Sequence, residues 1–479
     1  LFLLMLTLLL FFCKALLGLL HCLPLLCQKL VHKVVAHPVE STNNAVLDLF
    51  VPADDGLLDL LISTNHIFCN FFIALAGFFS LFTVSPAVSA APGKDPVMTS
   101  SPEAWVLVDG ISGFVMSASN KDKALSPGEL VHLMVIYTAL DAVAGDKNAL
   151  SAPVSITAAD VMRSSNSRRL YLVPGEPHPL RTLLHSIAVT GAEDAVLAVA
   201  AHFDKEANAF ARRMNETAEK LGLQQSRFVS PMEHADNRMS AHDLARLAIA
   251  VKKRFPQAYQ WFSEKEFVFT THSLRNRNQL LWRGAGIDGV MSNANNTSVI
   301  GSWHRDRNKN VMPRDVIAVL LGGQTSDLTT ADVQTLLRHG RLEYETLRLF
   351  PANTLVTKID ILTGNREKLE VGSADAIWVT VPRQDIVSRG LGGFTTQFEY
   401  MSPAVAPVKT GEVVGKLRVY FQNKHINDFD LVAMHDVGPG SFLSRFVDSV
   451  RLRMKPADNQ NEPVAVEVRR EDTVKKTQP

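Results

Sequence analysis

Apolar and polar positions divide the 479-residue chain into stretches of different character. Two long apolar runs open it, over residues 1–30 and 67–84. The second run is followed by small residues that include Val88 and Ala90, the pattern at which a secretory signal peptide is cleaved. An uncleaved membrane helix is the alternative, because about 18 apolar residues are enough to span a bilayer.

The segment before the second run, residues 1–65, has no clear globular pattern. We interpret it as an apolar N-terminal extension, either an over-extended reading of the gene or a genuine first membrane span. Residues 66–90 then form the signal peptide or membrane helix. The small residues favour cleavage after Ala90.

Short strands alternate with amphipathic helices between residues 91 and 350. Residues 105–109 and 114–117 predict a hairpin, and apolar positions three and four apart predict a helix that opens near Pro127. Residues 316–321 are a continuous apolar run, as expected for a central strand covered on both faces. Strands are also expected over 266–282, and helices over 180–223 (two), from Ser240 and over 328–349. Together these elements predict a mixed α/β domain with helices packed on a sheet.

The pattern changes after residue 350. Short alternating strands separated by Gly, Pro and Asn fill residues 351–437 without a strong helix, which predicts a small all-β sandwich domain. Residues 438–455 predict an amphipathic helix, whose apolar face carries Phe442, Leu443, Phe446, Val447, Val450 and Met454. The cations beside this face suit an anionic membrane surface, and packing on its own domain is the alternative. Residues 456–479 are polar and are expected to be disordered.

Composition adds two constraints. Lys and Arg number 49 and Asp and Glu 48, so the net charge of +1 gives no reason to expect a nucleic-acid partner. All four cysteines precede residue 70, so a chain cleaved near Ala90 contains none. A domain without cysteine is compatible with export to an oxidising compartment.

Several short motifs follow one another in a fixed order between residues 96 and 455. They read WVLVDGISG, VPGEP, GAEDA, NRNQLLW, IDGV and LLGGQT. This succession resembles the S11 peptidases, the low-molecular-mass penicillin-binding proteins, which are D-alanyl-D-alanine carboxypeptidases. The resemblance implies a beta-lactamase/transpeptidase-like domain with an antiparallel sheet and helices over 91–350, then the all-β domain and the amphipathic helix. It also implies a protein of the bacterial periplasm, at the outer face of the inner membrane.

Members of this family act through three motifs. Ser-x-x-Lys at a helix start places a serine nucleophile one turn from the lysine that takes its proton. Ser-x-Asn supplies a second hydroxyl and an amide for proton relay and substrate binding. Lys-Thr-Gly on an edge strand binds the substrate carboxylate and lines the oxyanion region.

The present chain departs from all three motifs. The matching positions are Glu129 and His132 for the first, Gly191 and Glu193 for the second, and Met291, Ser292 and Asn293 for the third. No Ser-x-x-Lys occurs anywhere in the chain, even under a shifted alignment. Lys409-Thr410-Gly411 and Ser164-Ser165-Asn166 spell the third and second motifs at unrelated places, and we interpret both as loops. We therefore predict that no catalytic motif is intact.

The substituted cleft is expected to bind the family's ligand poorly. A glutamate cannot replace serine as an acylating nucleophile without forming a labile anhydride. Met291 removes the cation that would hold a carboxylate, and Glu129 and Glu193 would repel it. We predict an inactive, membrane-associated relative that contacts peptidoglycan or cell-wall proteins and the membrane surface, with no cofactor.

Three alternatives stay open from the sequence. A residual or altered serine-type carboxypeptidase or cell-wall hydrolase activity is the first. Glu129, His132 and Glu193 could instead hold a divalent metal for a metal-dependent activity, or simply fill an abandoned site with Glu129 paired to His132. A decaying gene without a selected role is the third.

Overall fold

The computed structural model describes residues 96–441 and 462–468, apart from 147, 165–168, 205–206, 284–285, 294 and 307–311. The predicted N-terminal extension (1–65), the predicted signal or membrane segment (66–90) and residues 442–455 of the predicted amphipathic helix (438–455) therefore lie outside the described residues. Within the described part, no helix combines the length and the apolar character that crossing a membrane requires.

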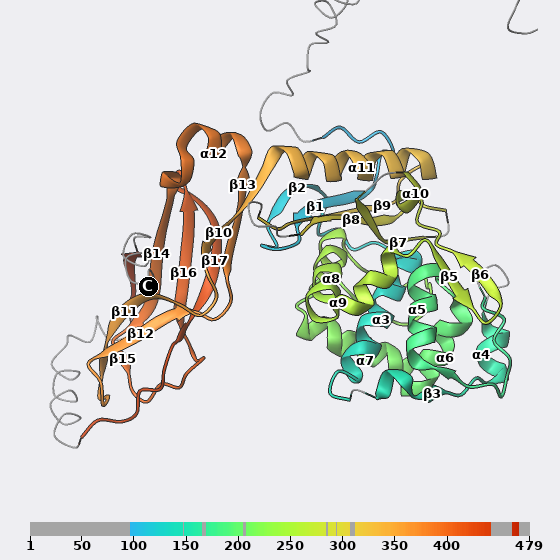
Figure 1. Ribbon diagram of the computed structural model, residues 1–479, viewed down its shortest axis with the longest axis horizontal. Helices are drawn as coiled ribbons and strands as arrows, with labels where there is room; N and C mark the ends of the chain where they lie inside the picture. Colours follow the sequence, from blue (N-terminus) through green and yellow to red (C-terminus); the bar gives the residue numbers. More distant parts are fainter. Residues whose placement is uncertain are drawn as a thin grey trace, which may run out of the picture. The chain divides into compact units, whose positions relative to one another are not determined.

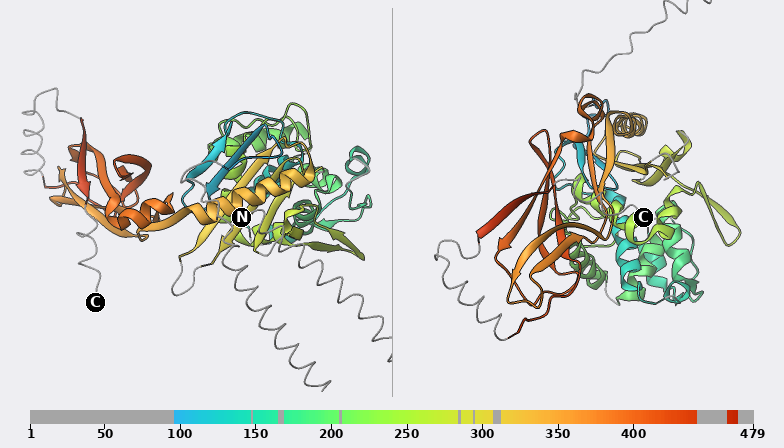
Figure 2. Two further views of the ribbon diagram at one scale, coloured as in Figure 1. Left: turned by 90° about the horizontal axis from the view of Figure 1, so that it is seen from above. Right: turned by 60° about the vertical axis from the view of Figure 1, so that its left-hand side comes forward.

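A five-stranded antiparallel sheet, in the order β2-β1-β9-β8-β7, organises the N-terminal domain. Its strands are β1 (Ala104–Asp109), β2 (Val115–Ser119), β7 (Ile287–Ser292), β8 (Val299–Arg305) and β9 (Arg314–Leu321). All eight residues of β9 are buried, which confirms the prediction of a central strand covered on both faces. Figure 1 and Figure 2 show α11 (Ser326–Glu343) running along one face of this sheet, with a cluster of long helices on the opposite face.

The helices on that opposite face build the main hydrophobic core. The long ones are α3 (Val131–Ala142), α5 (Leu180–Thr190), α6 (Glu193–Phe203), α7 (Ala207–Lys220) and α8 (Ala241–Arg254). The first ten residues of α3 are all buried, so α3 is the central helix of this layer. The Ser240 hydroxyl accepts a hydrogen bond from the Asp243 N–H at 3.0 Å, which confirms Ser240 as the cap of α8.

The short elements of this domain connect the longer ones. They are α4 (Ala158–Arg163), α9 (Pro256–Tyr259), α10 (Leu280–Arg283), β3 (Pro153–Val154), β4 (His178–Pro179), β5 (Glu266–Phe269), β6 (His272–Arg275) and the 3-10 turns Gly128–Leu130, Ala149–Ser151 and Gln260–Ser263. β5 and β6 pair as a hairpin, and β3 pairs with β4.

Three predicted elements differ from the structure. Residues 180–223 form three helices instead of two, because the chain leaves the helix at Asp204 before α7 begins. The strand predicted over 266–282 ends at Arg275, since α10 follows. The helix predicted over 328–349 ends at Glu343, because β10 (Tyr344–Phe350) pairs with β13 (Ile377–Pro382), a partner that is distant in the sequence.

A seven-stranded sheet, in the order β15-β11-β12-β17-β16-β14-β18, forms the body of the C-terminal domain. Its strands are β11 (Thr354–Leu362), β12 (Lys368–Ser373), β14 (Phe394–Ser402), β15 (Ala404–Val405), β16 (Val413–Phe421), β17 (Lys424–Ala433) and β18 (Glu462–Val468). The domain has its own core and is all-β as predicted, apart from α12 (Arg383–Arg389) and the 3-10 turn Gly390–Gly393.

Strand β18 corrects the prediction of disorder over residues 456–479 for the part that is described, residues 462–468. Residues 462–468 read EPVAVEV, and all seven pair antiparallel with residues 396–402 of β14. Valine at every second position suits a strand, and pairing satisfies backbone N–H and C=O groups at the edge of β14. Residues 442–461 therefore connect the end of the β domain to a strand of the same sheet.

Candidate functional site

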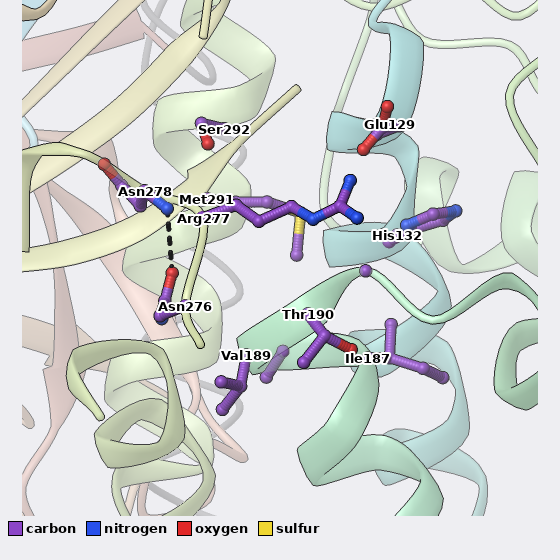
Figure 3. Close-up of a pocket in the computed structure, with 12 residues that line it drawn as sticks. Glu129, His132, Ile187, Val189, Thr190, Asn276, Arg277, Asn278, Met291 and Ser292 are labelled. Atoms are coloured by element: carbon purple, nitrogen blue, oxygen red, sulfur yellow. Dashed lines mark hydrogen bonds between the residues drawn. The ribbon is translucent and has the colours of Figure 1, made fainter. Parts of the chain in front are cut away.

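A small cleft lies where the start of α3, the end of α5 and strand β7 come together (Figure 3). Five of the seven positions that match the family motifs line this cleft: Glu129, His132, Gly191, Met291 and Ser292. The motif positions in the sequence therefore identify five residues that the fold brings together. Glu193 and Asn293 do not line the cleft. The Asn293 side chain instead accepts hydrogen bonds from the Thr297 and Ser298 N–H groups and shapes the turn after β7.

Glu129 and His132 stand at the beginning of the central helix. Glu129 lies in the 3-10 turn that follows Pro127, and His132 is the second residue of α3. Only 4% of Glu129 and 1% of His132 is exposed. A helix start that follows a proline is the local structure expected from the sequence.

The imidazole of His132 is buried without a hydrogen-bond partner. Neither of its ring nitrogens has one among the described residues. Burial lowers the pKa of His132 to about 4, and the nearby negative charge of Glu193 opposes this shift only in part. His132 is therefore neutral at pH 7.

Gly191 brings the end of α5 against the start of α3. It caps α5 in the left-handed conformation, with a φ of +68°, which favours glycine. A Cβ at this residue would lie 3.7 Å from Glu129 Oε2 and 3.8 Å from His132 Nδ1. The second motif's serine position thus meets the first motif's residues, as the resemblance implied.

Arg277 is a cleft residue that the sequence analysis did not identify. Figure 3 shows its side chain extending across the cleft, with the guanidinium directed toward Glu129 and His132. Two buried asparagines hold this segment, because the Asn276 side chain accepts the Asn278 N–H at 2.9 Å and donates to the Glu264 carbonyl at 3.0 Å. Met291 still replaces the cation of the third motif, but Arg277 brings a different cation to the cleft. The asparagines on both sides of Arg277 were the available sequence signal, since buried amides often fix a functional turn.

The side chains fill most of the cleft. The remaining cavity is about 20 Å³, which is room for about one water molecule. The described residues also contain no group of three or more His, Cys, Asp and Glu side chains that could hold a metal ion. The hypothesis of a metal site formed by Glu129, His132 and Glu193 is therefore not supported, since Glu193 does not line the cleft.

The Lys-Thr-Gly spelled by residues 409–411 lies in a turn of the C-terminal domain, as predicted. The Thr410 N–H and hydroxyl both donate to Asp436 at 2.7 Å, and Gly411 has a φ of +83°. These contacts account for the residues as parts of a turn.

Comparison with known proteins assigns both domains. Residues 90–324 match the family model of D-alanyl-D-alanine carboxypeptidase (peptidase S11), and residues 344–439 match the C-terminal domain of penicillin-binding protein 5. The second match begins at the first residue of β10. The chain is 28% identical over 389 residues to D-alanyl-D-alanine carboxypeptidase DacC of Escherichia coli K12, a match that spans 79% of this chain and 94% of that protein.

A second relative is also a D-alanyl-D-alanine carboxypeptidase, and a solved structure shares the fold. D-alanyl-D-alanine carboxypeptidase DacD of Escherichia coli K12 is 26% identical over 382 residues, which covers 77% of this chain and 96% of that protein. The crystal structure of penicillin-binding protein 5 from Haemophilus influenzae shares the fold, with a TM-score of 0.63 at 24% identity over 72% of this chain and 99% of that one. The chain belongs to the S11 peptidase family of D-alanyl-D-alanine carboxypeptidases, with degenerate catalytic motifs.

Proposed function

We propose that this chain is a catalytically inactive member of its family, exported and membrane-associated, which binds peptidoglycan or cell-wall proteins without hydrolysing them. One observation carries the proposal. At the family's serine position stands the buried carboxylate side chain of Glu129, one turn from a neutral imidazole in place of the lysine.

Acyl transfer by this family needs a hydroxyl that is activated by a neighbouring base. The two hydroxyl residues that line the cleft do not meet this need. The Thr190 hydroxyl donates to the Ser186 carbonyl at 2.8 Å, and the Ser292 hydroxyl is buried without a partner. Because His132 is also without a partner, no hydroxyl–imidazole pair is assembled. A pKa of about 4 also makes His132 a weak base at neutral pH.

The charges in the cleft also disfavour the family's ligand. Arg277 supplies one cation, and the carboxylate of Glu129 lies on the side of the cleft toward which that cation points (Figure 3). A D-alanyl-D-alanine end carries a free carboxylate, so it would meet an anion together with the cation. The cavity of about 20 Å³ is also much smaller than the roughly 300–1,000 Å³ of small-molecule sites.

A fluorescent penicillin tests the absence of catalysis. We expect no covalent labelling of the purified full chain under conditions that label DacC of Escherichia coli to completion, because the acylated serine has no counterpart. Stoichiometric covalent labelling would overturn the proposal.

The same measurement addresses an altered serine-type activity. This second candidate is favoured by one observation, the unpartnered Ser292 hydroxyl in the cleft that also contains His132. If labelling occurs, the variant Ser292→Ala decides its origin. Loss of the label in this variant assigns the activity to Ser292, and an unchanged label directs the search to another nucleophile.

Export and membrane association rest on the sequence pattern. The small residues before Ala91 support cleavage, and the apolar face over residues 442–454 supports contact with the membrane surface. Strand β18 returns the chain to the β domain after this segment, because it pairs with β14. A helix over residues 442–455 would therefore be tied to the domain at both ends.

A further inference from the structure

A second and larger groove lies beside the hairpin formed by β5 and β6. Its volume is about 400 Å³, within the roughly 300–1,000 Å³ of small-molecule sites. Residues 169–173 together with Glu176 and His178 form one wall, and the hairpin forms the other. Val173 and Glu176 belong to the VPGEP motif. Figure 1 shows this hairpin at the end of the domain that also carries α4 and α6. No part of the catalytic cleft lines this groove.

The buried Asp194 side chain holds the backbone on both sides of Tyr171, whose ring lies at the groove. Asp194, at the start of α6, is fully buried and accepts hydrogen bonds from the N–H groups of Leu170 at 3.0 Å and Leu172 at 3.2 Å. Tyr171 lies between these two residues. It has a φ of +58° and is 73% exposed. A left-handed tyrosine is costly, and it persists here because Asp194 fixes the backbone on both sides.

The groove combines apolar surface with polar rims. Phe269 and Leu274 supply apolar surface, and the ring of His178 lies 5.1 Å from that of Phe269. Exposed polar side chains, Glu176, Thr270 and His272, line it as well. Pockets of this kind use their apolar faces for affinity and a few polar groups for orientation.

The charge of the groove indicates a neutral ligand. Arg169 is its one lysine or arginine and Glu176 its one carboxylate, so neither sign is in excess among the lining residues. A sugar ring suits this lining, because its C–H face packs on an aromatic ring while its hydroxyl and amide groups form hydrogen bonds at the rim. A peptide end with a free carboxylate would need an excess of cations.

We propose that this groove binds a neutral saccharide, of the N-acetylhexosamine class, with one sugar ring stacked on Tyr171. The proposal rests on the proposed function only in taking the cell wall as the source of the ligand. The hairpin wall of the groove continues into the cleft, because β6 leads directly to Asn276 and Arg277.

Titration of the full chain with triacetylchitotriose, a neutral N-acetylglucosamine oligomer, tests this site. We expect saturable binding by calorimetry and by saturation-transfer NMR. Tyr171→Gly should lower the affinity about tenfold, the equivalent of one lost stacking contact. Glycine is the suitable replacement because it adopts the left-handed conformation without cost, so the fold is kept. Tyr171→Phe should bind as the parent chain does, since it retains the ring.

A matched control is Asn353→Gly, which changes another left-handed residue, with a φ of +52°, in the C-terminal domain. This variant should bind the saccharide like the parent chain. Three results would overturn the proposal: no saturable binding, equal binding by Tyr171→Gly, or displacement of the saccharide by a peptide ending in D-alanyl-D-alanine. Covalent labelling by penicillin, in contrast, would overturn the absence of catalysis while leaving the saccharide site untouched.

Discussion

The burial of His132 should make the free energy of unfolding depend on pH. The folded chain keeps its imidazole neutral down to about pH 4, whereas an exposed histidine protonates near 6.5. The unfolded chain therefore binds more protons between these two values. Protonation in this window favours unfolding, so His132 should lower the free energy of unfolding as the pH falls from about 6.5 to about 4. The full loss is on the order of 3 kcal/mol.

Replacing the imidazole isolates this effect. His132→Leu should be at least as stable as the parent chain at pH 7, because it removes two buried nitrogens without partners. The stability difference in its favour should grow as the pH falls toward 4. Urea unfolding at pH 7, 5.5 and 4.5 measures the difference, and carboxylates that titrate in both proteins cancel. Parallel stability curves would show that His132 has an ordinary pKa.

Residue positions were partly predictable from the sequence. Glu129, His132, Gly191, Met291 and Ser292 follow from landmarks spaced along the chain, and the fold brings all five to one cleft. Arg277 could not be predicted from the three catalytic motifs, because it lies outside all of them. The filling of the cleft also could not be predicted, since it depends on side-chain directions.

Among the elements, Asp194 joins the start of helix α6 to the segment that contains Tyr171 and should contribute to the stability of the fold. Asp194→Ala should destabilise the chain by about 3 kcal/mol, because the buried N–H groups of Leu170 and Leu172 lose a charged acceptor. The midpoint of urea unfolding should fall while the slope stays constant.

Asp375→Ala is the matched control, because the Asp375 side chain is 90% exposed and faces Lys253 only at 3.9 Å. We expect a change of less than about 0.5 kcal/mol for it. Equal effects of the two variants would contradict the assigned role of Asp194.

Elements with a clear local sequence signal were predicted well. Strands that depend on pairing with a strand distant in the sequence were not. The apolar run of β9 and the cap of α8 are local signals, and both are present in the structure. β10 and β18 owe their strand conformation to pairing with β13 and β14. Local polarity concealed them, since residues 344–349 follow a helix without a break and residues 462–468 lie in a charged tail.

At the scale of the whole molecule, the membrane proposal makes the last prediction. Truncation after Gly440 would also remove β18, so substitutions within the segment are more informative. Phe446→Glu with Val450→Glu places two carboxylates on the predicted apolar face. Because each lost apolar contact is worth roughly 1.5–3 kcal/mol, sedimentation of the signal-cleaved chain with vesicles of anionic lipid should fall at least about tenfold.

The control is Ser444→Glu with Ser449→Glu, which adds the same charge at two serine positions of the same segment. It should lose less binding than the first variant, because it leaves the apolar face intact, and part of its remaining binding should be sensitive to salt. Equal losses in both variants would show that charge alone governs binding. Unchanged sedimentation of the first variant would exclude the membrane helix, and the segment would then serve only as the connection from the β domain to β18.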